Sequence, residues 1–174
     1  VTFDETLRLP RLRNGREVLE RIHYIQEHDI VFRRNAERGE IWADKRRAGS
    51  NEKFQLIQLS DGQVALKGSI GYLATKKRGG RAVYAKSNDL GPLERWTLIS
   101  NADGTVSLRA DGSDHLLYAM SGSASLCDAI RPDIASDEKF HTVRHDDGTV
   151  SLKTAKKGLF VSVHSSVSSR DPVN

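Results

Sequence analysis

Asp147-Gly148-Thr149-Val150-Ser151-Leu152-Lys153 is the last of three copies of one seven-residue pattern. The earlier copies are residues 103–109, Asp-Gly-Thr-Val-Ser-Leu-Arg, and residues 61–67, Asp-Gly-Gln-Val-Ala-Leu-Lys. The copies recur after 42 and then 44 residues, and each aspartate follows an aromatic residue by 7 positions. These aromatic residues are Phe54, Trp96 and Phe140. Repetition at this period indicates a fold assembled from similar units that bury their apolar faces against one another.

Each copy of the pattern predicts a β-hairpin. Asp-Gly supplies the positive φ angles that a tight turn between two strands requires. After the turn, Val150 and Leu152 stand two apart and therefore point to one face of the strand, whereas Ser151 points to the other. The upstream aromatic residue lies on the preceding strand and supplies a large area to the core.

The rest of the chain predicts an all-β fold. From residue 30 to residue 163, runs of three to six residues alternate in character and are separated by Gly, Asn and Asp. Three repeats of about 42 residues with four strands each specify a β-trefoil better than a β-propeller, which normally needs more blades. Three units need twelve strands, whereas the sequence offers thirteen, or fourteen if residues 18–25 are extended. Residues 150–153 and 159–163 either close this barrel or begin a second trefoil, and we favour closure.

The expected domain organisation is a single trefoil with an extension. Residues 1–29 form an N-terminal extension that packs on the barrel, and residues 30–174 form the trefoil. The units cover about 30–62, 63–104 and 105–148, with closing strands in 149–163. Apolar residues at helical spacing predict a helix over about 16–28, and a strand is the competing interpretation. They are Val18, Leu19, Ile22 and Ile25.

The composition narrows the classes of partner. The chain has 27 basic and 23 acidic residues, a net charge of +4, which allows an acidic partner but falls short of the density typical of nucleic-acid binding. No apolar run approaches the roughly 20 residues of a membrane span. Cys127 is the only cysteine, so an internal disulfide is excluded. We expect a monomeric, cytoplasmic protein, or a secreted one if a signal peptide has been removed.

Several phrases resemble β-trefoils of the fascin-like, actin-crosslinking type. They are Gly71-Tyr72-Leu73-Ala74, Gly91-Pro92-Leu93-Glu94-Arg95-Trp96 and residues 103–108, with a looser copy at 157–162. In that family a unit typically reads DG.VSL…G.YLSA…GP.E.F. The resemblance covers roughly residues 30–163 and implies the trefoil fold and F-actin binding. The Gln-x-Trp motif of ricin-type lectins does not recur in each unit.

Basic residues in predicted loops are the leading candidates for binding an acidic surface. They are Arg33, Arg34, Arg46, Arg47, Lys76, Lys77, Arg78 and Arg81. Arg33-Arg34 and Lys76-Lys77-Arg78 both follow a second strand, so two units would share a basic face that the third unit lacks. The simpler interpretation is ordinary solvated surface charge.

Trp42 is the candidate aromatic platform for a carbohydrate ligand. Phe54, Trp96 and Phe140 hold the repeated core position, whereas the counterparts of Trp42 are Tyr84 and, in the third unit, Cys127. This variation in side-chain size fits either a buried position that packs differently in each unit or an exposed platform for sugar stacking.

Neither catalysis nor metal binding is indicated. His141 and His145 would lie about 13 Å apart along a strand, too far for a shared ion. Cys127 lies in a predicted strand, where a buried thiol is the ordinary state. We therefore expect a non-catalytic binding module without cofactor or metal, most simply for F-actin. The alternatives are a lectin-like carbohydrate-binding module, and a module that binds nucleic acid or sulfated glycans.

Overall fold

The computed structural model describes residues 3–4, 9–10, 37–78, 80–119 and 127–165. The chain divides into one unit of residues 37–167 and another of residues 1–36 with 168–174. In the latter, β1 (Phe3–Asp4) pairs antiparallel with β2 (Leu9–Pro10). The predicted helix over 16–28 and the boundary between residues 29 and 30 lie outside the described residues.

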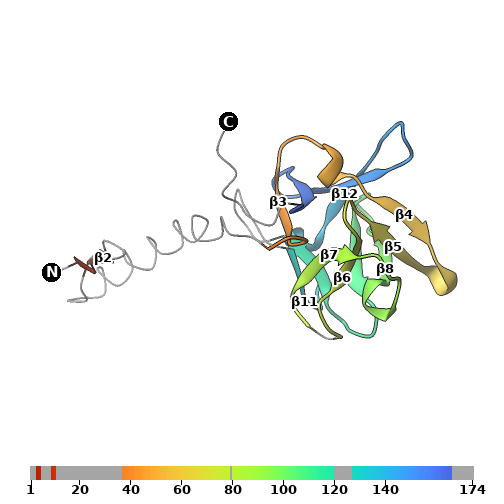
Figure 1. Ribbon diagram of the computed structural model, residues 1–174, viewed down its shortest axis with the longest axis horizontal. Helices are drawn as coiled ribbons and strands as arrows, with labels where there is room; N and C mark the ends of the chain where they lie inside the picture. Colours follow the sequence, from red (N-terminus) through yellow and green to blue (C-terminus); the bar gives the residue numbers. More distant parts are fainter. Residues whose placement is uncertain (1–2, 5–8, 11–36, 79, 120–126, 166–174) are drawn as a thin grey trace. The chain divides into compact units, whose positions relative to one another are not determined.

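The described residues between 37 and 165 fold as an all-β trefoil whose strands form one 12-stranded antiparallel sheet (Figure 1). The strands are β3 (Ile41–Lys45), β4 (Gln55–Gln58), β5 (Gln63–Lys67), β6 (Tyr72–Thr75), β7 (Val83–Ser87), β8 (Trp96–Ser100), β9 (Val106–Ala110), β10 (Leu116–Ala119), β11 (Cys127–Arg131), β12 (Phe140–Arg144), β13 (Val150–Thr154) and β14 (Phe160–Val163). Short 3-10 turns lie between them: η2 (Ser50–Glu52), η3 (Ser60–Gly62), η4 (Pro92–Glu94) and η5 (Ser136–Glu138).

The barrel is closed by a backbone bridge between Phe54, before β4, and Val150 of β13, and the third lobe is completed by a pairing between the first and last strands of the trefoil. β14 pairs with β3, with Val163 opposite Ile41 and Phe160 opposite Lys45. Although no loop joins them, β14 and β3 form an antiparallel pair equivalent to the β6–β7 and β10–β11 hairpins of the other two lobes. Lobe one therefore comprises β4–β7, lobe two β8–β11, and lobe three β12–β14 together with β3. The strands at 150–154 and 160–163 close this trefoil.

The repeated Asp-Gly turns adopt the predicted backbone. Gly62, Gly104 and Gly148 have φ angles of 73°, 87° and 86°, the left-handed region that favours glycine. In lobe two, the carboxylate of Asp103 accepts hydrogen bonds from the backbone nitrogen and the hydroxyl of Thr105. Asp147 and Thr149 repeat the arrangement in lobe three.

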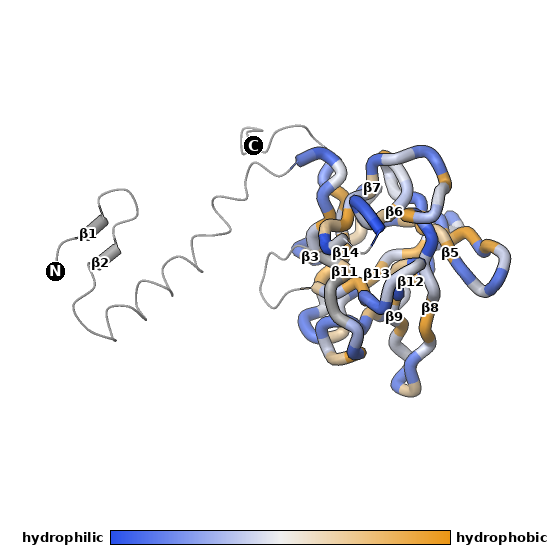
Figure 2. Tube along the Cα trace, turned by 90° about the horizontal axis from the view of Figure 1, so that it is seen from below, coloured by the Kyte–Doolittle hydropathy of each residue, from blue (hydrophilic) through white to orange (hydrophobic). Residues whose placement is uncertain are grey.

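The aromatic residues of the repeat form the centre of the core. Phe54, Trp96 and Phe140 are each 0% exposed, as the sequence predicts, and full burial of one such ring stabilises the fold by about 2–3 kcal/mol. The indole Nε1 of Trp96 donates to the carbonyl of Leu73 at 2.9 Å, which satisfies the one polar atom of that ring. The side chain of Cys127 is buried in the same core. In Figure 2, hydrophobic segments follow the strands, and several connecting loops are hydrophilic.

The acidic residue before each aromatic residue, and the basic residue before two of them, have structural roles. The carboxylates of Glu52, Glu94 and Glu138 accept hydrogen bonds from the backbone nitrogen three residues earlier, at 3.0, 3.1 and 3.0 Å. Lys139 lies 2.9 Å from the Asp103 carboxylate of the preceding lobe, and Lys53 lies 3.5 Å from Asp147. These ion pairs connect one lobe to the next.

Candidate basic binding surface

The loop between β6 and β7 carries four of the predicted site residues. Its ends are joined because the backbone nitrogen of Lys76 donates to the carbonyl of Ala82 at 2.8 Å. A tighter turn lies inside it, where the nitrogen of Gly80 donates to the carbonyl of Lys77 at 2.8 Å. A Cβ atom at Gly80 would lie 2.8 Å from that carbonyl oxygen, so this turn requires glycine. The hydrogen bonds fix the backbone from which the cations project.

Lys76, Lys77, Arg78 and Arg81 are all exposed, and we call them the basic hairpin end. A hollow of about 730 Å³ opens beside them, lined by Lys76, Lys77, Gly80, Arg81 and Ala82. Its cations come from both sides of the loop, since residues 76–77 leave β6 and residues 81–82 enter β7. The sequence alone predicts the cations but not that they share a hollow.

Lys76 is held against an aromatic ring that sequence reasoning did not include in the site. Its ammonium lies 5.4 Å from the centroid of the Tyr84 ring, and the ammonium of Lys86 lies 5.1 Å from the same centroid. Each contact at a surface position stabilises the arrangement by about 0.5–1 kcal/mol. The sequence signal for Lys86 is its place two residues after Tyr84 on one strand, which puts both on one face.

Arg78 connects the loop to lobe two. Gly112, in the turn after β9, has a φ angle of 71°, and a Cβ atom there would lie 2.6 Å from Nε of Arg78. The guanidinium therefore packs directly on the backbone of this turn. In the described part of the chain, no carboxylate lies within ion-pair distance of Lys77, Arg78 or Arg81.

The other predicted basic residues do not join this cluster. Arg46 and Arg47 are exposed but follow the far end of β3. Glu40, before the near end of β3, forms a bridge with Tyr84, and Arg46 lies six residues further along the chain, about 20 Å away at the usual rise per residue of a strand. Arg33 and Arg34 lie outside the described residues.

Trp42 does not form an exposed platform, because its side chain is buried and only 8% exposed. Its expected counterpart in the third unit is also corrected by the pairing of the strands. Tyr84 pairs with Ala74, Trp42 with Ser162 and Asp128 with Tyr118, so Asp128 holds the position assigned to Cys127. Cys127 instead corresponds to Ile41 and Val83 at the starts of β3 and β7, which explains its burial.

The environment of Asp44, in β3 beside β14, opposes ionisation of its carboxyl group. Its Oδ1 is buried without a hydrogen-bond partner among the described residues. Burial raises its pKa, and the neighbouring Glu52 raises it further, whereas Lys45 and His164 act in the opposite direction.

Within the described ranges, no group of three His, Cys, Asp or Glu side chains is arranged to hold a metal ion. Nor does any helix there have the length and apolar character needed to cross a membrane.

Comparisons with known proteins give structural neighbours only. No protein-family model and no curated protein matches the chain. The chain is similar to the designed three-fold symmetric protein ThreeFoil, with 19% identity, a TM-score of 0.48, and coverage of 68% of this chain and 83% of that one. It is similar to the BEL β-trefoil in an apo crystal form, with 10% identity, a TM-score of 0.42, and coverage of 67% of this chain and 86% of that one. It is also similar to the cytolethal distending toxin of Haemophilus ducreyi, with 13% identity, a TM-score of 0.37, and coverage of 68% of this chain and 76% of that one.

Proposed function

We propose that this trefoil is a non-catalytic binding module that attaches to F-actin through the basic hairpin end. The observation that carries the proposal is the set of four exposed cations on one braced loop, with no described carboxylate within ion-pair distance of Lys77, Arg78 or Arg81. Cations that are not neutralised by neighbouring acids attract an acidic surface and accelerate its association.

The choice of F-actin rests on the resemblance to fascin-like trefoils. The phrases that carry it are residues 71–74, at the start of β6, and residues 91–96, which include η4. The basic hairpin end follows directly after β6, so it belongs to the part of the chain that carries the resemblance. An F-actin ligand implies a cytoplasmic protein, in keeping with a sequence that contains a single cysteine. Crosslinking of two filaments requires a second site or a second domain.

A carbohydrate-binding module is the alternative from another class. Sugar binding of the stacking kind needs an exposed aromatic face, whereas Trp42 is buried and two lysines lie against the ring of Tyr84. A sulfated glycan or a nucleic acid would instead use the same cations, with a steep dependence of affinity on salt. A glycan array measures the carbohydrate alternative directly.

Charge reversal tests whether the basic hairpin end is the filament site. The variant K76E/K77E/R78E is compared with K45E/R46E/R47E, which makes the same change in net charge at exposed residues at and just after the far end of β3. We expect at least a tenfold loss of affinity for filaments in the first variant, about 1.4 kcal/mol, and a much smaller loss in the second. Equal losses in both variants would show that binding depends on overall charge and not on this loop.

A further inference from the structure

We propose that the hollow of the basic hairpin end binds a phosphate or sulfate group, a tetrahedral oxyanion, as its preferred ligand. The inference rests on the proposed function, because it assigns a ligand chemistry to the same site. The hollow is lined by the side chains of Lys76, Lys77 and Arg81 together with Gly80 and Ala82. Three cations around one space favour an anion with several oxygens and more than one charge over a single carboxylate.

The geometry of the loop brings these cations to one space. Lys76 and Lys77 lie on the outgoing side of the loop and Arg81 on the returning side, and the hydrogen bond from Lys76 to Ala82 joins the two sides. On the returning side, the carbonyl of Arg81 accepts a hydrogen bond from the nitrogen of Ala129 in β11 at 3.2 Å. The backbone on both sides is thus fixed, which lowers the entropy lost when an anion binds.

The chemical roles differ among the three side chains. The guanidinium of Arg81 offers a planar set of donors that matches two oxygens of a phosphate or sulfate group. The ammonium groups of Lys76 and Lys77 act as point charges for the remaining oxygens. Lys76 contributes from a position already restricted by the ring of Tyr84. Gly80 lets the loop close tightly, since a Cβ atom there would meet Cγ of Lys77 at 2.7 Å.

Calorimetric titration of the full chain with inorganic phosphate, sulfate and acetate at constant ionic strength tests this proposal. We expect phosphate and sulfate to bind at least tenfold more tightly than acetate. The variant K77Q/R81Q should weaken phosphate binding at least tenfold, whereas R46Q/R47Q, with the same change in charge, should leave it within about twofold. Equal affinity for acetate, or equal phosphate binding by both variants, would overturn the proposal.

Two further titrations identify the source of the anion and separate this proposal from the filament site. O-phosphoserine and glycerol 1-phosphate represent protein-borne and lipid-borne phosphate, and the tighter ligand names the source. If phosphate binds the hollow but the chain does not sediment with filaments, the proposed function fails and this inference stands. If the chain sediments with filaments but binds neither phosphate nor sulfate, this inference fails and the proposed function stands.

Discussion

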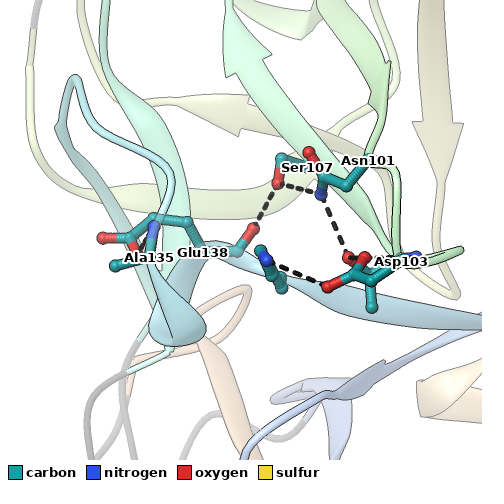
Figure 3. Close-up of polar contacts among 7 residues, drawn as sticks. Asn101, Asp103, Ser107, Ala135 and Glu138 are labelled. Atoms are coloured by element: carbon teal, nitrogen blue, oxygen red, sulfur yellow. Dashed lines mark hydrogen bonds and ion pairs between the residues drawn. The ribbon is translucent and has the colours of Figure 1, made fainter.

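The side-chain nitrogen Nε2 of His145 lies 2.6 Å from the hydroxyl oxygen of Ser151, which in turn lies 2.6 Å from the carbonyl oxygen of Glu52. Because a hydroxyl has only one proton, Ser151 donates to Glu52 and accepts from His145. Lobe two has the same series of two hydrogen bonds between other residues. Asn101 donates to the hydroxyl of Ser107 at 3.0 Å, and Ser107 donates to the carbonyl of Glu138 at 2.8 Å (Figure 3).

Lobe one lacks both polar partners at once. The backbone nitrogens of Leu59, Asn101 and His145 each donate to the carbonyl four residues later, which identifies the three positions as equivalent. Leu59 has no side-chain donor, and Ala65 occupies the place of the buried serines. The same two positions of the repeat therefore hold a hydrogen-bonded polar pair in lobes two and three and the apolar pair Leu59 and Ala65 in lobe one.

Replacement of Ser107 by alanine should destabilise the trefoil by about 1–3 kcal/mol, because a buried carbonyl and an amide would each lose a partner. The double variant N101L/S107A reproduces the pair Leu59 and Ala65 of lobe one. Its loss of stability should be smaller than the sum of the two single losses. Urea unfolding of the four proteins measures this coupling, and strict additivity would contradict it.

Gly71 and Gly104 should differ sharply in their tolerance of alanine. A Cβ atom at Gly71 would lie 2.5 Å from the backbone carbon of Lys86, whereas at Gly104 it would meet nothing within 4 Å. We expect G71A to cost about 3 kcal/mol through overlap with the backbone of β7. G104A should cost about 1 kcal/mol through its positive φ angle alone. Thermal and urea unfolding compare the two, and equal losses would show that β7 yields to the added methyl group.

The turn aspartates should make stability depend on acid pH. Donors on Thr149 lower the pKa of Asp147 from 3.8 to about 2, and donors on Thr105 and Lys139 hold the pKa of Asp103 well below its usual range. Because both pKa values are lowered by folding, the stabilisation is present above pH 3.8, and the contribution of Asp147 is lost as the pH falls through about 2. D103N/D147N should therefore be less stable than wild type near about pH 6, and the difference should shrink near about pH 2. A difference independent of pH would contradict this account.

Asp44 should act with the opposite sign. Burial raises its pKa above 3.8, so the folded state binds this proton more tightly and stability falls as the pH rises through the folded pKa. The charged groups around it are Lys45, Glu52 and His164. We expect D44N to be more stable than wild type at about pH 7, with the difference vanishing in acid. A less stable D44N at neutral pH would show that the charge has a favourable partner.

The repeated pattern predicted most of the fold because its information is local. The turn at Asp147-Gly148, the alternation of Val150 with Leu152 and the aromatic Phe140 all act within one hairpin. The strand count remained ambiguous because the last hairpin is formed by β14 and β3, from opposite ends of the chain. No local pattern shows that pairing. Because of the pairing between β14 and β3, the structural lobes begin later in the sequence than the predicted units, and β3 belongs to the last lobe.

The candidate site could be predicted only in part. The sequence identified Lys76, Lys77, Arg78 and Arg81 as loop cations, since hairpin loops are recognisable from their composition. It missed the packing of Arg78 on Gly112, which joins residues from two lobes. Trp42 appeared free to form a platform because the alignment of the units made Tyr84 and Cys127 its counterparts, side chains of very different size. The register of the strands places Asp128 and not Cys127 at the equivalent position, and the side chain of Trp42 is buried.

Co-sedimentation of the unmodified chain with F-actin across a series of salt concentrations tests the central claim most directly. The account predicts saturable sedimentation at low salt that weakens as salt is added, because the proposed contact is made by exposed charges that salt screens. The variant K76E/K77E/R78E should remain in the supernatant under conditions in which K45E/R46E/R47E still sediments. Failure of the unmodified chain to sediment at low salt would remove F-actin as the ligand of this trefoil.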